Sequence, residues 1–300
     1  MKILLTGAFG FLGNYIKAKI ENDSRNVVTI GRNKANDFQV DLSKDIPSFK
    51  NQYFNFVIHS AGKAHSVPNT NYEKEEFYSV NVRGTKNLLS GLDLLNIKPE
   101  SFVFISTVAV YGLNNGFNVN ETAPLNALDA YGHSKILAEK MIEKWCKENK
   151  VICTILRLPL VVGKNSLGNL KSMINGIKKG YYVNIGGGQA RKSMVLAKDV
   201  AEYIYTLHFI GGVYNITDGF HPSFFDLSEA IAIKSQSKKP KNIPLYIALM
   251  LARIGDLFGK KFPFNTVKFL KITSDLTFDD TKARSVGWKS TSVLEDFNIL

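Results

Sequence analysis

Two groups of residues in this chain have types and spacing that could do chemistry. One is a glycine-spaced segment at residues 6–13, Thr-Gly-Ala-Phe-Gly-Phe-Leu-Gly, and the other is Tyr131-Gly132-His133-Ser134-Lys135. Residues four apart on a helix share a face, so Tyr131 and Lys135 lie one turn apart. A neighbouring ammonium favours ionisation of a phenol, whose ordinary pKa is about 10. We therefore expect this pair to exchange a proton with a carbinol oxygen while a nicotinamide exchanges the hydride.

The glycine-spaced segment predicts a phosphate cradle, because it follows an apolar run and opens a helical pattern. Its spacing is G-x-x-G-x-x-G, which differs from the G-x-G-x-x-G fingerprint. Asp41 and Leu42 are expected beside the adenine, and Asn81 behind the ribose-binding face. The remaining residues expected to contact the dinucleotide are Gly7, Phe9, Gly10, Phe11 and Leu12 in the cradle, Ser60, Ala61 and Gly62 beneath the pyrophosphate, and Leu158 and Pro159 beside the nicotinamide.

The end of the second predicted strand bears on which nicotinamide is bound. NAD-binding chains often carry a carboxylate there for the ribose hydroxyls, but this chain reads Gly31-Arg32-Asn33-Lys34. Arg32 could form a paired hydrogen bond with a 2′-phosphate, which favours NADP. The alternative is that Arg32 stacks on the adenine of NAD.

A second Tyr-x-x-x-Lys pair, Tyr15 and Lys19, lies on the first predicted helix, where no hydroxyl-bearing strand end accompanies it. Tyr131 instead follows Ser106-Thr107 at the carboxyl end of a predicted strand, where ligands bind in parallel sheets. Thr107, Tyr131 and Lys135 are the predicted catalytic residues, with Thr107 orienting the reacting oxygen. His133 is expected on the other side of the helix, in a structural or surface role.

Apolar strands alternate with helical patterns over the first half of the chain, which predicts an α/β fold with a doubly wound parallel sheet. We expect residues 1–160 to bind the dinucleotide and residues 161–300 to form mainly a smaller substrate-binding region, either separate from the sheet or interleaved with it. The predicted strands are 2–5, 27–30, 54–59, 101–106 and 151–157, and the predicted helices are 11–20, 73–95 and 131–146.

The chain has 300 residues, 45% of them apolar, which suits one large domain or two closely joined ones. Its two cysteines fit neither a metal site nor a redox pair, so no metal is expected and the chain is placed in the cytoplasm. No transmembrane segment is expected, and residues 243–258 are interpreted as a core or lid helix.

The net charge of +12 is interpreted as solvated basic loops rather than a nucleic-acid site. The alternatives are that the positive charge attracts a diphosphate substrate or the cytoplasmic membrane face.

Taken together, these residues resemble the extended short-chain dehydrogenase/reductase family, in its nucleotide-sugar epimerase/dehydratase branch, whose dinucleotide domain is Rossmann-type. The resemblance covers nearly the whole chain. It rests on residues 6–13, 59–62, 81–85, 106–107 with 110–112, 131–135, 157–163, 191–195, and 279–283 with Gly287 and Trp288.

The resemblance implies a nucleotide-sugar substrate, often UDP-linked, that is oxidised or reduced at C4, with Thr107 and Arg191 contacting it. The branch's 4,6-dehydratases carry Asp-Glu after the catalytic Thr, whereas Val108-Ala109 stand here, which disfavours a dehydratase. A 4-ketoreductase of a UDP-4-keto-6-deoxy-N-acetylhexosamine, serving surface-polysaccharide synthesis, is slightly favoured over a 4-epimerase with retained NAD.

The resemblance also implies a homodimer formed through helices 73–95 and 131–146. A non-catalytic alternative, a nucleotide sensor or RNA-binding relative, is disfavoured because Thr107, Tyr131 and Lys135 are all present.

Overall fold

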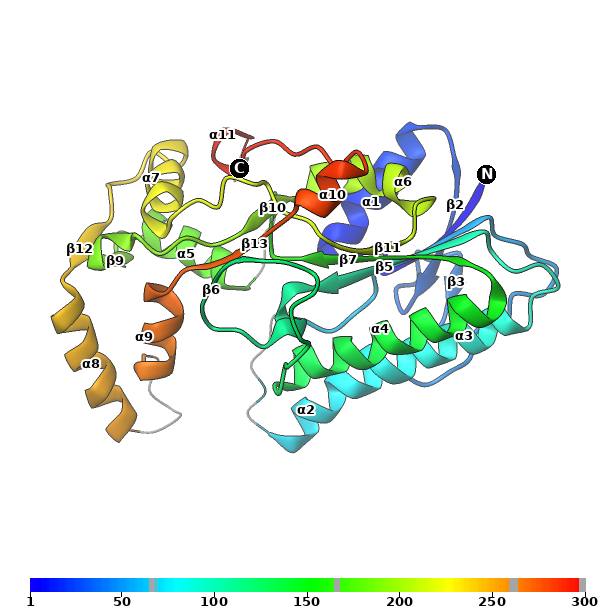
Figure 1. Ribbon diagram of the computed structural model, residues 1–300, viewed down its shortest axis with the longest axis horizontal. Helices are drawn as coiled ribbons and strands as arrows, with labels where there is room; N and C mark the ends of the chain where they lie inside the picture. Colours follow the sequence, from blue (N-terminus) through cyan, green and yellow to red (C-terminus); the bar gives the residue numbers. More distant parts are fainter. Residues whose placement is uncertain (65–67, 69, 165–167, 259–263, 297–300) are drawn as a thin grey trace.

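The computed structural model describes residues 1–64, 68, 70–164, 168–258 and 264–296, and its centre is a parallel seven-stranded sheet (Figure 1). The five strands predicted from the sequence are confirmed, and two further strands, β3 and β11, extend the sheet at its edges. In sheet order the strands are β11 (Gly212–Asn215), β7 (Ile152–Leu158), β5 (Ser101–Thr107), β4 (Phe56–His59), β1 (Lys2–Thr6), β2 (Asn26–Gly31) and β3 (Phe38–Gln39).

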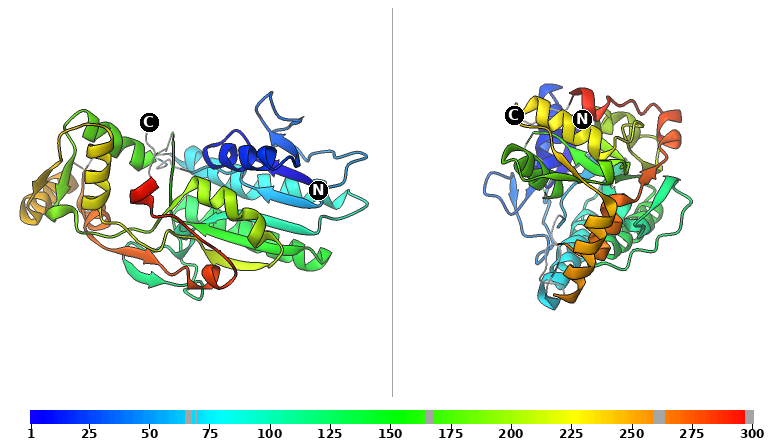
Figure 2. Two further views of the ribbon diagram at one scale, coloured as in Figure 1. Left: turned by 90° about the horizontal axis from the view of Figure 1, so that it is seen from above. Right: turned by 90° about the vertical axis from the view of Figure 1, so that its left-hand side faces the viewer.

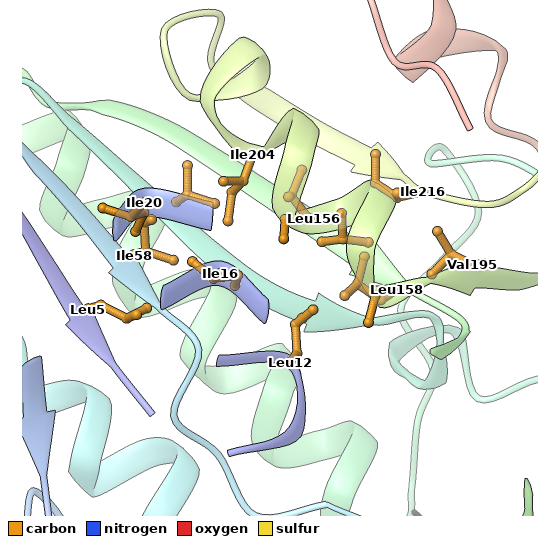
Figure 3. Close-up of a cluster of buried hydrophobic side chains, with 14 of the residues drawn as sticks. Leu5, Leu12, Ile16, Ile20, Ile58, Leu156, Leu158, Val195, Ile204 and Ile216 are labelled. Carbon is orange, nitrogen blue, oxygen red and sulfur yellow. The ribbon is translucent and has the colours of Figure 1, made fainter. Parts of the chain in front are cut away.

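Helices cover both faces of this sheet, which explains why the central residues of its inner strands are consecutively apolar. On one face α1 (Phe11–Asn22) packs beside α6 (Ala197–His208). On the other face α3 (Gly84–Asp93) packs beside α4 (Ala130–Asn149) (Figure 1). Figure 3 shows the core beneath the first pair, where side chains of the two helices meet those of the strands: Leu5, Leu12, Ile16, Ile20, Ile58, Leu156, Leu158 and Ile204.

The helix predicted over residues 73–95 is present, but its middle is not an α-helix. It consists of α2 (Asn71–Phe77), a π-helical segment η1 (Tyr78–Arg83) and α3. A π-turn widens the helix by one residue and recurs at functional sites. Sequence periodicity over a long window does not reveal one extra residue, so this feature was not predicted. Its consequence is that Asn81 is buried, facing the sheet edge.

The remaining elements form a second region, apart from the sheet in Figure 2, and built from two-stranded parallel pairs and short helices. Residues 197–215 leave this region, because α6 covers the main sheet and β11 pairs with β7. The elements of this region are β6 (Gly116–Val119) with β13 (Leu276–Phe278), β8 (Leu160–Val162) with β10 (Met194–Leu196), β9 (Val183–Ile185) with β12 (Lys241–Ile243), α5 (Gly168–Lys178), α7 (Phe224–Lys234), α8 (Leu245–Leu257), α9 (Thr266–Thr273), α11 (Val293–Asp296) and the 3-10 turn η3 (Gly186–Gly188). The short helix α10 (Thr281–Ser285) contacts β11, and the 3-10 turn η2 (Val108–Tyr111) contacts α4.

The apolar stretch at residues 243–258, interpreted as a core or lid helix, forms α8, and the core alternative is wrong. The residues that α8 buries are small, namely Ala248, Ala252 and Gly255, whereas most of its large apolar side chains are exposed. An apolar stretch does not specify which side of a helix faces inward; here α9 packs against the small residues. No helix among the described residues has the length and hydropathy needed to cross a bilayer.

Candidate active site

Polar side chains gather where the central strands end. Within the sheet register Thr6 of β1 lies beside His59 of β4, and Ser106 of β5 lies beside Arg157 of β7. Because the strands are parallel, these ends share one edge of the sheet, where ligands bind in open α/β folds. The two motifs singled out in the sequence therefore open onto the same edge.

The glycine-spaced segment forms a tight turn between β1 and α1. Gly7 has φ +71°, and a Cβ there would lie 2.7 Å from the Ala61 amide nitrogen. A Cβ on Gly13 would lie 1.9 Å from the Gly7 carbonyl oxygen, so only glycine lets helix and strand pack this closely. Gly10 precedes α1 with no side chain capping the first helical amides. These amides and the helix dipole can therefore receive a pyrophosphate.

Beside this turn lies a cleft of ≈ 370 Å³ that suits the adenosine half of a dinucleotide. Sequence reasoning missed the asparagines of its wall, Asn33 and Asn36, which lie in a turn with no distinctive motif. Phe11 and Leu12 begin α1 next to the cleft, and Leu158 and Pro159 lie at the end of β7. The predicted cofactor residues that line the cleft are Gly7, Phe9, Gly10, Arg32, Asp41, Leu42, Ser60, Ala61 and Gly62.

The charged residues of the cleft differ in their availability to a ligand. Asp37, the first carboxylate after β2, accepts hydrogen bonds from the Thr29 amide (2.7 Å) and hydroxyl (2.8 Å). Arg32 is exposed on the cleft wall. Burial opposes ionisation of Asp41, but hydrogen bonds from Ser43 and the charge of Arg32 hold its pKa below the ordinary value. The wall thus presents one guanidinium and one ionised carboxylate.

The buried imidazole of His59 makes hydrogen bonds that link the segments beneath the site. Thr85 donates its hydroxyl to the Asn81 carbonyl (2.6 Å), so it accepts from His59 Nε2 (2.9 Å). The Nδ1 atom is then unprotonated and accepts from the Thr6 hydroxyl (2.7 Å), which itself accepts from the Ala61 amide (3.0 Å). Burial, and then the charge of Lys135, lowers the pKa of His59 to about 3. This neutral imidazole connects β1, β4 and the helix behind them.

Asn81 is buried and makes its hydrogen bonds within the protein. Its side chain accepts from the Lys63 amide (2.7 Å) and donates to the Lys63 carbonyl (3.1 Å) and the Ser134 hydroxyl (2.9 Å). It therefore fixes α4 and the chain after β4 to the π-helical segment.

The structure brings together the three predicted catalytic residues. Tyr131 and Lys135 lie in the first two turns of α4, and the Tyr131 hydroxyl hydrogen-bonds with the Thr107 side chain at the end of β5. The Lys135 Nζ atom donates to the Ile105 carbonyl (2.7 Å) and lies 3.7 Å from the centre of the Phe104 ring. The constellation is held by one helix and one strand.

Burial opposes ionisation of both the Tyr131 phenol and the Lys135 amine. Burial raises the pKa of Tyr131, although the hydrogen bond with Thr107 acts in the opposite direction, so the phenol is protonated at neutral pH. Burial also lowers the pKa of Lys135 to about 7, so less of the ammonium charge that favours the phenolate is present at neutral pH. A protonated phenol is suited to donating a proton to a carbonyl oxygen.

The other residues that the sequence analysis considered contact the protein away from Thr107, Tyr131 and Lys135. The Tyr15 hydroxyl accepts from the Lys164 amide (2.7 Å), and Lys19 pairs with Asp23 and Glu202. The Nδ1 atom of His133 lies 3.1 Å from the Tyr78 hydroxyl, a hydrogen bond between α4 and the π-helical segment. Arg191 is exposed in the second region, where its guanidinium donates to the His221 carbonyl (3.4 Å).

Sequence reasoning missed a buried ion pair beneath the catalytic residues. Glu139 is 2% exposed and Arg157 5%, and their side chains meet at 2.7 Å. Glu139 also accepts from Ser106, while Arg157 donates to the Tyr111 hydroxyl (3.1 Å). The spacing contained a signal, since Glu139 lies four residues after Lys135 as Lys135 lies four after Tyr131.

Comparisons with known proteins agree with this geometry. The model of the NAD dependent epimerase/dehydratase family matches residues 3–216. The N-acetyl-α-D-glucosaminyl-diphospho-ditrans,octacis-undecaprenol 4-epimerase of Escherichia coli O157:H7 is 28% identical over 71% of this chain and 66% of its own length. The UDP-glucose 4-epimerase of Vibrio cholerae is 27% identical over 98% of this chain and 92% of its own.

Solved structures share the fold over almost the whole chain. The UDP-glucose 4-epimerase of Thermotoga maritima, solved with UDP-glucose, covers 99% of this chain and 96% of its own, with a TM-score of 0.77 and 21% identity. Other neighbours were solved with NAD or with NADPH. The dinucleotide cradle, the tyrosine–threonine–lysine constellation and the family match lead to one conclusion: this chain is a nicotinamide-dependent enzyme that belongs to the NAD dependent epimerase/dehydratase family.

Proposed function

We propose that this chain is an NADP-dependent 4-ketoreductase of a UDP-linked 4-keto-6-deoxy-N-acetylhexosamine, acting in the cytoplasm in surface-polysaccharide synthesis. The observation that carries the proposal is the placement of Tyr131 beside Thr107, with Lys135 one turn later on α4, at the sheet edge that also carries the dinucleotide cleft. The exposed Arg32 on the cleft wall supports NADP, because a guanidinium can make paired hydrogen bonds with a 2′-phosphate.

In this reaction the bound nicotinamide supplies the hydride. Tyr131 donates its proton to the developing alkoxide at C4, and Thr107 holds that oxygen in line. Lys135, fixed by the Ile105 carbonyl, would hold the nicotinamide ribose, and its charged form would stabilise the phenolate that remains on Tyr131. We assign Arg191 to the diphosphate of the substrate, Leu158 and Pro159 to the nicotinamide side, and residues 161–300 mainly to the sugar and its nucleotide. Two copies pair through α3 and α4 as a homodimer.

A second candidate is a 4-epimerase that retains NAD. Relatives of this chain are named as 4-epimerases, and one of them acts on a sugar joined through a diphosphate. The same Tyr131 would then serve first as base and afterwards as acid, with hydride returned to the opposite face of the sugar. Val108 and Ala109 carry no proton-transferring group in either candidate.

The nucleotide that copurifies with the protein separates the two candidates. We expect the purified protein to release little nucleotide on denaturation, to bind NADPH, and to oxidise it when a UDP-4-keto-6-deoxy-N-acetylhexosamine is added. Tightly held NAD, together with interconversion of UDP-sugars without net NADPH oxidation, would establish the epimerase instead.

Arg32→Ala tests the cofactor preference. We expect the Kd of NADPH to rise by about tenfold or more while that of NADH changes little, because the lost guanidinium faces only the additional phosphate. Lys34→Ala, two residues later and also exposed, is the matched control and leaves both constants unchanged. Equal weakening of NADPH and NADH by Arg32→Ala would contradict the assignment. Titration of intrinsic fluorescence gives both constants.

A further inference from the structure

The end of β2 carries no side chain that could reach the adenosine ribose, because residue 31 is a glycine. The carboxamide of Asn36 lies against this glycine. A Cβ on Gly31 would be 3.3 Å from Asn36 Nδ2 and 3.6 Å from Asn36 Oδ1. Both residues line the cleft that suits the adenosine half of a dinucleotide. The amide of Asn36 therefore occupies the space into which a side chain at position 31 would project.

The hydrogen-bonding groups of the Asn36 side chain are only partly used within the protein. Its Nδ2 atom donates to the Asn33 carbonyl (2.8 Å), which also accepts from the Asn36 backbone amide (3.1 Å). The first of these bonds identifies which end of the carboxamide is the oxygen. That oxygen, Oδ1, is buried and has no hydrogen-bond partner among the described residues. A buried acceptor without a partner is costly, so a ligand that donates to Oδ1 gains affinity.

The carboxylates closest to Asn36 in the sequence already have partners. Asp37 accepts from the Thr29 amide (2.7 Å) and hydroxyl (2.8 Å). Asp41 accepts from the Ser43 amide (3.1 Å) and hydroxyl (2.7 Å). The Asn36 oxygen differs from both carboxylates, because it is neutral and its hydrogen-bonding capacity is unused.

The chemistry of the adenosine ribose indicates what an amide at this place can bind. NAD carries hydroxyls at the 2′ and 3′ positions, whereas NADP carries a 3′-hydroxyl beside a 2′-phosphate. A carboxylate accepts from the hydroxyls but repels the phosphate. A carboxamide accepts through its oxygen, and the second hydrogen of its nitrogen can be donated to a phosphate oxygen. An amide is therefore compatible with both coenzymes, and a carboxylate only with NAD.

We propose that Asn36 determines how this chain recognises the adenosine ribose, with Oδ1 accepting from a ribose hydroxyl and the neutral amide admitting a 2′-phosphate beside Arg32. The terminal torsion of an asparagine is broad and Asn36 is half-buried, so a small rotation turns its amide towards the cleft. Gly31 permits this arrangement, since a side chain there would displace the amide. The inference deepens the proposed function and rests on it for the 2′-phosphate, whereas the hydroxyl contact applies to NAD as well.

Equilibrium titration of the full chain with NADPH and with NADH tests the proposal. Asn36→Ala is expected to raise both dissociation constants about three- to tenfold, because a ribose hydroxyl loses its acceptor. Asn36→Asp is expected to raise the ratio of the NADPH constant to the NADH constant at least about tenfold, because the carboxylate accepts from hydroxyls and repels the 2′-phosphate. Asn26→Asp, exposed at the other end of β2, is the matched control; it adds the same charge and leaves this ratio unchanged.

A role of Asn36 confined to holding its turn gives a different result, since both variants would then weaken the two coenzymes equally. An unchanged ratio in an Asn36→Asp protein with the melting temperature of the wild type would therefore overturn the proposal, even where the wild type prefers NADPH. Unchanged constants in Asn36→Ala would also overturn it. A raised ratio in Asn36→Asp, found together with a wild-type preference for NADH, would support the role of Asn36 and contradict only the proposed NADP dependence.

Discussion

Tyr131→Phe is expected to lower kcat by at least about a hundredfold, since a positioned general acid contributes 10²–10⁴-fold. The substitution removes one oxygen from a half-buried ring that packs on Phe77, so the shape of the site is kept. Binding of the nicotinamide nucleotide should change little, because the adenosine cleft is lined by other residues. Stopped-flow absorbance of the reduced nicotinamide measures the hydride step, and equilibrium titration measures binding.

Tyr15→Phe is the matched control for this experiment, because Tyr15 and Lys19 repeat the same Tyr-x-x-x-Lys spacing on α1. Its hydroxyl accepts only from the Lys164 amide in the described structure, so its loss should leave kcat within about twofold. Similar kcat values for the two variants would remove the proton-transfer role of Tyr131.

The sequence was sufficient for features that depend on local pattern. Apolar runs located β1, β4 and β5, and the glycine spacing located the turn that now shows a Gly7 φ of +71°. The parallel order then placed Thr107 and Tyr131 at one edge, because the carboxyl ends of such strands are adjacent. Each of these inferences depends only on residues close together in the sequence or on a general rule of sheet topology.

Other features depend on contacts between residues far apart in sequence. The tautomer of His59 follows from Thr6 and Thr85, which lie 53 and 26 residues away. The inward face of α8 is decided by α9, because the stretch is apolar on several sides. A π-turn that buries Asn81 leaves the helical periodicity almost unchanged. In each case tertiary packing selects among arrangements that the local sequence allows equally.

Glu139→Gln is expected to destabilise the chain by about 3–5 kcal/mol, because it leaves the Arg157 guanidinium buried without its counter-charge. Glu143→Gln, one turn later on α4 and exposed, is the matched control and should cost less than about 0.5 kcal/mol. Urea unfolding monitored by tryptophan fluorescence gives both free energies. The double variant Glu139→Gln/Arg157→Met should recover part of the loss, because no unpaired charge then remains buried.

The same substitution should also change the pH dependence of catalysis, which a purely structural pair would not do. Burial lowers the pKa of Lys135 to about 7, and the Glu139 carboxylate opposes that shift. Without the carboxylate the pKa of Lys135 falls further, so the ammonium is lost at lower pH. The alkaline limb of kcat against pH should therefore move towards acid in Glu139→Gln and stay in place in Glu143→Gln. If the alkaline limb did not move in a folded Glu139→Gln protein, Glu139 would serve only to pair with Arg157. It would then have no influence on the pKa of Lys135.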